Sequence, residues 1–113
     1  MFPIIPANSV AASAGNDEGI FGFGYAPPGW TVSNITNLVS NAGVIASDVS
    51  GIGTAKGYTA ACEYGGDKGI FGFGWVGSMT NVTNLVSNAG VVASDQAATT
   101  GTARANPGGC SFN

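Results

Sequence analysis

Asp67-Lys68-Gly69-Ile70-Phe71-Gly72-Phe73-Gly74 repeats, almost residue for residue, the earlier stretch Asp17-Glu18-Gly19-Ile20-Phe21-Gly22-Phe23-Gly24. A second stretch, residues 34–48, returns as residues 81–95, and the two copies differ only at Ile35/Val82 and Ile45/Val92. A repeat of this kind indicates a supersecondary module that cannot bury its own apolar face and packs against neighbouring modules. The sequence is therefore informative mainly about assembly.

The repeat sets the domain organisation. Gly-Thr-Ala-Lys at residues 53–56 returns as Gly-Thr-Ala-Arg at residues 101–104. We treat the chain as a single domain, 1–113, and divide it into repeat unit 1 (10–58), repeat unit 2 (59–104) and a partial third unit (105–113). Repeat architectures usually need about three units to close a core. We therefore expect a partner outside the chain to complete this one.

The residue pattern predicts an all-β fold, with four short antiparallel strands in each unit. Residues 20–24 alternate aromatic residues with glycine, which is typical of a strand. Residues 40–43, Ser-Asn-Ala-Gly, lie between two short apolar runs and predict a hairpin turn in which Asn or Gly has a positive φ. A short helix over residues 34–44 is the alternative, but the Asn, Ser and Gly residues within it disfavour a helix.

The same register predicts one strand without a partner. A strand of small residues is expected near Val10, at residues 60–64 and again at residues 108–112, but no second strand follows the last of these. An unpaired strand exposes backbone donors and acceptors, which proteins normally cover. We therefore predict that this last segment is an inter-subunit strand, added to a neighbouring chain. Its residues include Cys110, Ser111 and Phe112.

Composition excludes several classes of partner. The net charge is −3, and the only cations are Lys56, Lys68 and Arg104, so the chain has no basic footprint for nucleic acid or anionic membranes. The first residues have neither a basic segment nor an apolar run long enough for a signal peptide or a membrane span. We expect a soluble product made in a cytoplasm, which is compatible with later assembly into an extracellular particle.

The sequence carries no pattern of catalytic residues. Histidine is absent, which removes the commonest general base and metal ligand. Asp17 and Asp67 are repeat-equivalent, as are Asp48 and Asp95, so we expect each pair to cap turns in similar environments and not to act as acid and base. No enzyme activity, cofactor or metal is predicted. The two cysteines, Cys62 and Cys110, occupy equivalent positions and are expected to be buried free thiols.

Aromatic residues are the remaining candidates for recognition. Four phenylalanines alternate with glycine, so each pair is expected to point to one face of its strand and to pack between units; they are Phe21, Phe23, Phe71 and Phe73. Trp30, Trp75 and Tyr25 lie just beyond these strands, where the two units differ most. We predict that they contact a ligand, by stacking on a sugar ring, or anchor a subunit interface.

These repeats resemble two kinds of known sequence. Four strands per unit of about fifty residues, with a glycine-rich second strand such as residues 69–74, resemble the kelch-type β-propeller blade. The Ile-Phe-Gly-Phe-Gly and Thr-Asn-Leu-Val-Ser-Asn motifs also resemble repeats found in long arrays in predicted phage and viral virion proteins.

The resemblance implies a fold and a function. It implies two propeller-like blades per chain, closed into a ring by homo-oligomerisation, for which a trimer of six blades is favoured. It implies a non-enzymatic structural protein of a virus or phage particle, such as a decoration, cement or fibre component. Its partners are then copies of itself and other virion proteins or surface glycans. The alternative is a secreted or cell-surface propeller lectin that uses the loop aromatics.

Overall fold

The computed structural model describes residues 17–96 and 101–112. Within these ranges the chain forms seven β-strands and no helix, which confirms the all-β class. No closed propeller is present in this part of the chain. Among the same residues no helix is long and apolar enough to cross a membrane. The strands of unit 1 are β1 (Gly19–Gly22), β2 (Tyr25–Ala26), β3 (Thr31–Val32) and β4 (Thr36–Val39); those of unit 2 are β5 (Ala60–Tyr64), β6 (Lys68–Trp75) and β7 (Met79–Val86).

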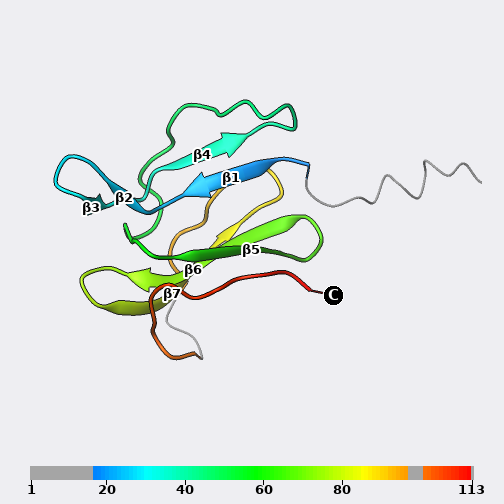
Figure 1. Cartoon of the computed structure of the whole chain (residues 1–113). Helices are drawn as coiled ribbons and strands as arrows, with labels where there is room; N and C mark the ends of the chain where they lie inside the picture. The colour runs from blue at the N-terminus through cyan, green and yellow to red at the C-terminus, as the bar shows by residue number, and fades with distance from the viewer. Residues whose placement is uncertain (1–16, 97–100, 113) are drawn as a thin grey trace, which may run out of the picture.

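The strands form three small antiparallel sheets. In unit 2, β6 lies between β5 and β7, while in unit 1 β1 pairs with β4 and β2 pairs with β3. Gly65 and Gly66, with φ of 64° and 84°, form the tight turn between β5 and β6, where residues with side chains are rarely found. Figure 1 shows β1 and β4 of unit 1 stacked over β5 and β6 of unit 2.

The Ser-Asn-Ala-Gly segments form the predicted turns. In unit 1 the Ser40 amide donates to the Val44 carbonyl at 2.9 Å, and Val39 is bridged to Ile45. Gly43 has the expected positive φ, 81°, and Gly90 repeats it in unit 2 with 78°. The hairpin prediction is confirmed, and the alternative of a helix over residues 34–44 is wrong.

The predicted fourth strand of each unit is reduced to isolated bridges. In unit 1, Thr36 is bridged to Val49, but the residues between this bridge and the turn are not in a ladder. The Asn37 side chain donates instead to the Ala46 carbonyl, at 3.1 Å, and to Asp48 Oδ1, at 2.8 Å. A side chain therefore takes the place of a backbone ladder bond, and Asn84 repeats this arrangement in unit 2.

The prediction that both phenylalanines of a pair point to one face of their strand is wrong. The pairing of β6 with β7 shifts between Gly72 and Gly74, and Phe73 between them has φ of 63°. Phe71 packs against unit 1, whereas Phe73 contacts Arg104. Because a β-bulge reverses the direction of the next side chain, the two rings serve different contacts. Phe23 has the same backbone conformation in unit 1, with φ of 64°.

The C-terminal segment follows the course of β5. The Asn106 amide donates to the Tyr58 carbonyl at 2.9 Å, and Ser111 Oγ accepts from the Glu63 amide at 2.9 Å and donates to its carbonyl at 2.8 Å. Residues 106–112 therefore run beside residues 58–64 in the same direction, as Figure 1 shows. The strand predicted near Val10 lies outside the described residues.

Candidate functional site: the joint between the units

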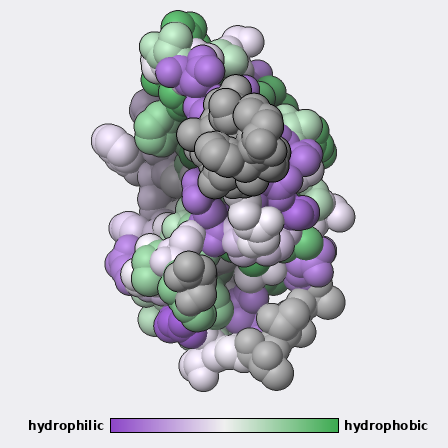
Figure 2. Space-filling view, turned by 90° about the vertical axis from the view of Figure 1, so that its right-hand side faces the viewer, coloured by the Kyte–Doolittle hydropathy of each residue, from purple (hydrophilic) through white to green (hydrophobic). Residues whose placement is uncertain are grey.

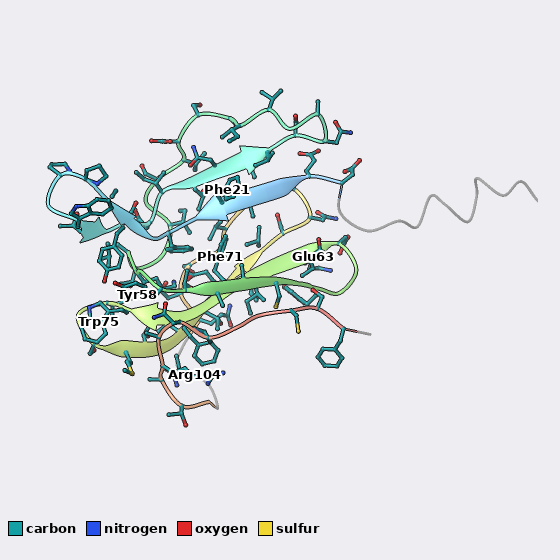
Figure 3. All side chains as sticks on the ribbon, in the orientation of Figure 1. Phe21, Tyr58, Glu63, Phe71, Trp75 and Arg104 are labelled. Atoms are coloured by element: carbon teal, nitrogen blue, oxygen red, sulfur yellow. The ribbon has the colours of Figure 1, made fainter. Side chains whose placement is uncertain are left out.

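The two units meet where the β1–β4 sheet of unit 1 and the loop after it pack against the β5–β6–β7 sheet of unit 2, and we call this contact the joint. We define the joint by Gly22, Phe23, Leu38, Gly53, Thr54 and Lys56 of unit 1 and by Phe71, Asn84, Gly90, Val92 and Asp95 of unit 2. It contains four of the buried side chains of the described residues, those of Lys56, Phe71, Asn84 and Val92, and Val86 packs beside Phe71 and Val92. Figure 3 shows Phe71 between the two sheets.

Phe71 is the apolar centre of the joint. Only 4% of this residue is exposed, and its ring lies edge-on to Phe23 with centroids 5.1 Å apart. A Cβ atom at Gly22 would lie 2.9 Å from the Phe71 ring, so glycine is required there for the ring to reach the backbone of unit 1. Leu38 packs in the same way on Gly90 of the second unit's turn.

Lys56 is a buried cation in the joint. Its residue exposure is 0%, its Nζ lies 4.0 Å from the centroid of the Phe23 ring, and it donates a hydrogen bond to Asn84 Oδ1. Burial lowers the pKa of the Lys56 ammonium, while the charge of Asp95 acts in the opposite direction. A buried ammonium is tolerated only when it is paired and hydrogen-bonded, so Asn84 and Phe23 hold this charge in place.

Hydrogen bonds within unit 2 hold the side chain of Asn84 in position to accept from Lys56. Its exposure is 0%, and its Nδ2 donates to the Ala93 carbonyl at 3.2 Å and to Asp95 Oδ1 at 2.9 Å. Both side-chain donors are therefore used inside unit 2, which leaves Oδ1 directed at unit 1 as the acceptor for Lys56.

Asp95 ties the loop of unit 1 to unit 2. The Thr54 amide donates to Asp95 Oδ1 at 3.0 Å, and the Thr54 hydroxyl donates to Oδ2 at 2.5 Å. Partial burial acts to raise the pKa of Asp95, but the hydrogen bonds from Thr54 and Asn84 and the charge of Lys56 outweigh it, and the pKa lies below its usual value. The prediction that Asp95 caps a turn is wrong in one respect, because the backbone amide that it caps belongs to the other unit.

Asp95→Asn is expected to lower the free energy of unfolding at pH 7 by about 1.5–3 kcal/mol, the range for hydrogen bonds to a charged group. The folded-state pKa of Asp95 is depressed, so its contribution is present above about pH 4 and is lost as the pH falls through the folded-state pKa. Urea unfolding at pH 7 and pH 3 measures the free energy of unfolding. The difference in this free energy between the wild type and the variant should be smaller at pH 3.

Asp48→Asn is the matched control. Asp48 is the same residue in unit 1, but among the described residues it accepts a side-chain hydrogen bond only from Asn37. Its substitution in the single chain should change the free energy of unfolding by less than about 0.5 kcal/mol. Equal losses in the two variants would contradict the assigned role of Asp95.

Unit 1 presents the equivalents of the buried unit 2 residues on its outer face. Phe21 is the repeat equivalent of Phe71 but is 64% exposed, and Ile45, the equivalent of Val92, is 58% exposed against 7%. Gly43 faces open space, whereas its equivalent Gly90 is packed against Leu38. The unit 2 side of the joint therefore recurs on the outer face of unit 1, and no other described residues cover it.

Unit 2 presents the other half. Arg104, the equivalent of Lys56, lies over Phe73 with its guanidinium carbon 4.2 Å from the ring centroid, as Lys56 lies over Phe23. Arg104 is exposed, however, as is Thr102, the equivalent of Thr54. Figure 3 shows Arg104 on the side of unit 2 that faces away from unit 1.

No model of a known protein family matches the chain, and no curated protein matches it.

The predicted aromatic site is brought together in part. The Tyr25 ring lies over Gly57 and pairs with Tyr58 at a centroid distance of 5.0 Å, and Gly57 in turn is bridged to Trp75. Tyr25 and Trp75 therefore meet at the same backbone segment, between the units. Trp30 lies in the turn between β2 and β3 and is 72% exposed. Cavities of about 350 and 190 Å³ lie between the units, and none of these three residues lines either one.

The predicted strand residues are placed beside β5. Ser111 is hydrogen-bonded to Glu63, whereas Cys110 is exposed and Phe112 is 94% exposed. Both cysteines are free thiols, as predicted, but Cys62 is only half-buried, so the prediction of two buried thiols is wrong. The segment lies at the edge of the sheet, where no further strand covers its side chains in the described residues.

The network around Asp95 was not predicted, although the sequence contains its signal. The recurrence of Gly-Thr-Ala followed by a cation, together with the recurrence of Asn and Asp eleven positions apart, marks both halves of the joint. Within residues 17–96 and 101–112, no group of three or more His, Cys, Asp or Glu side chains could hold a metal ion.

Proposed function

We propose that the chain is a non-enzymatic structural protein that acts through homo-oligomeric assembly, as a decoration, cement or fibre component of a virus or phage particle. One observation carries the assembly: the residues that form the joint inside the chain have repeat equivalents at both ends of the stack, and several of these are exposed, namely Phe21, Ile45, Asp48, Thr102 and Arg104. The virion role rests on the resemblance of the repeat motifs. Light scattering at micromolar concentration should give a mass of two or more whole chains, and the mass of a single chain would contradict the proposal.

Two features support propeller-like blades closed into a ring. Residues 106–112 form no strand, but they run parallel to β5 and beside it, as the innermost segments of adjacent blades around a channel do. The sheets also meet through side chains on their faces, since the Phe71 ring of β6 packs on Gly22 of β1. A ring of four to eight blades needs two to four chains, and we favour three chains with six blades.

The surface suits a protein that is covered by copies of itself. Figure 2 shows apolar residues scattered among polar ones on the face turned to the viewer, without one continuous apolar area. Single exposed apolar residues such as Val44 and Val91, 65% and 63% exposed, are tolerated on a protein surface.

A carbohydrate-binding protein is the second candidate, favoured by the exposure of Trp30. An exposed indole offers the flat apolar face that stacks on a sugar ring. If this function holds, Trp30→Ala should abolish binding on a glycan array and leave the melting temperature unchanged, because the side chain lies in an exposed turn. Trp75→Ala is the comparison, since this residue is less exposed, at 36%, and is bridged to Gly57. If either substitution breaks the oligomer instead, the residue is an interface anchor.

A further inference from the structure

We propose that copies of this chain join head to tail, with the outer face of unit 1 of one copy seated on the outer face of unit 2 of the preceding copy. The contact would repeat the internal joint, residue for residue. This inference rests on the proposed assembly and specifies its surfaces. Because the two faces differ, the contact is heterologous, and it closes into a ring or continues as a filament according to its rotation.

The apolar part of the contact is formed by Phe21. In the internal joint, Phe71 packs on Gly22 and on the Phe23 ring. The equivalent positions of unit 2 are Gly72, which is already buried in the single chain, and Phe73, which is half-buried. Phe21 of the next copy, 64% exposed in the single chain, therefore has the half-buried Phe73 ring to pack on.

The polar part of the contact is already organised on both faces. Asn37 Nδ2 is held by the Ala46 carbonyl and Asp48, as Asn84 is held in unit 2, so its Oδ1 is positioned as an acceptor. In the preceding copy Arg104 lies over Phe73 in the place of Lys56. Arg104 would reach Asn37 as Lys56 reaches Asn84, and a guanidinium can add a bond to Asp48.

Thr102 completes the match. In the internal joint the amide and hydroxyl of Thr54 donate to Asp95. Thr102 has the same place in unit 2 and its side chain makes no hydrogen bond within the described residues, while Asp48 of the next copy offers the equivalent carboxylate. Each donor left over at one face thus has its acceptor on the other face, which is why we assign the occupant as a second copy and not an unrelated partner.

The C-terminal segment, which forms no strand in the single chain, would extend the contact to the backbone by pairing with the next copy. One side of residues 108–112 lies along β5. Among the described residues, no strand is paired with their other side. β1 pairs with β4 on one edge only, among the same residues. The register of β5 with β6 transfers to these segments and places Gly108 opposite Gly22 and Cys110 opposite Ile20 of the next copy.

A directed disulfide tests the contact. In a background with Cys62→Ser and Cys110→Ser, one sample carries Thr102→Cys and another carries Asp48→Cys. Mild oxidation of the mixture should give the mixed disulfide dimer, whereas each sample alone should give none. Thr54→Cys with Asp95→Cys in one chain is the matched control, because these positions already meet and should form an intramolecular disulfide.

The outcomes separate this inference from the proposed function. Homodimers formed by Thr102→Cys alone, or an oligomer of unchanged mass without the mixed disulfide, would overturn the head-to-tail contact and leave assembly standing. Absence of both oligomer and disulfide would overturn the inference and the proposed function. With both substitutions in one chain, a covalent ring of fixed size or a ladder of lengths would each support the contact.

Deletion of residues 105–113 examines the C-terminal segment by a second route. Loss of the mixed disulfide and of the oligomer, with the unfolding transition of the remaining chain retained, supports pairing with β1 of the next copy. An oligomer of unchanged mass and stability would show that the C-terminal segment takes no part in the contact.

Discussion

Phe71→Ala is expected to lower the free energy of unfolding by about 3–5 kcal/mol, the range for truncating a buried aromatic ring. The ring is 4% exposed and contacts Phe23 and Gly22 of the other unit, so its loss leaves a cavity in the only buried apolar cluster of the described residues. The total free energy of unfolding of a domain of this size is about 5–15 kcal/mol. Urea unfolding at a chain concentration low enough for single chains to predominate measures the effect.

Phe21→Ala supplies the comparison within the same molecule. The residue has the same neighbours in sequence as Phe71 but is 64% exposed, so in the single chain its truncation should cost less than about 0.5 kcal/mol. If both substitutions destabilise the single chain equally, Phe71 does not have the central role in the joint that the stacking assigns to it.

Much of the fold could be predicted because it is local. The Ser-Asn-Ala-Gly turns follow from the freedom of glycine at positive φ, and β5 and β6 follow from β-favouring residues around a Gly-Gly turn. The bulge at Phe73 could not be read in this way. A non-glycine residue at φ of 63° is uncommon, and it is held there by its contact with Arg104 and by the backbone bond from Gly74 to Arg104, which the pattern of one strand does not reveal.

The joint could be predicted only in outline. Repeat-equivalent residues look the same in a sequence, so Asp48 and Asp95 were expected to have similar surroundings. The structure separates them by their position in the stack, because Asp95 faces the loop of the preceding unit and Asp48 has no preceding unit within the described residues. Tyr25 and Trp75 meet at Gly57 between the units, which the sequence pattern did not indicate, and their role in binding a ligand or anchoring a subunit interface stays a prediction.

Phe21→Asp should abolish assembly without unfolding the chain. A carboxylate in place of the ring would lose the aromatic contact with Phe73 of the preceding copy and place a charge in an apolar contact, at a large cost in free energy. In the single chain the side chain is exposed, so the unfolding midpoint at low concentration should not change. Met79→Asp is the control, since Met79 is also exposed, at 56%, and has no equivalent in the joint.

The native mass of the wild-type chain beside that of Phe21→Asp tests assembly through repeated joints most directly. Light scattering at micromolar concentration should give an integer multiple of the chain mass for the wild type and for Met79→Asp, with three chains favoured, and a single chain mass for Phe21→Asp. A cooperative, well-folded wild-type monomer, or an oligomer that Phe21→Asp leaves intact, would contradict it.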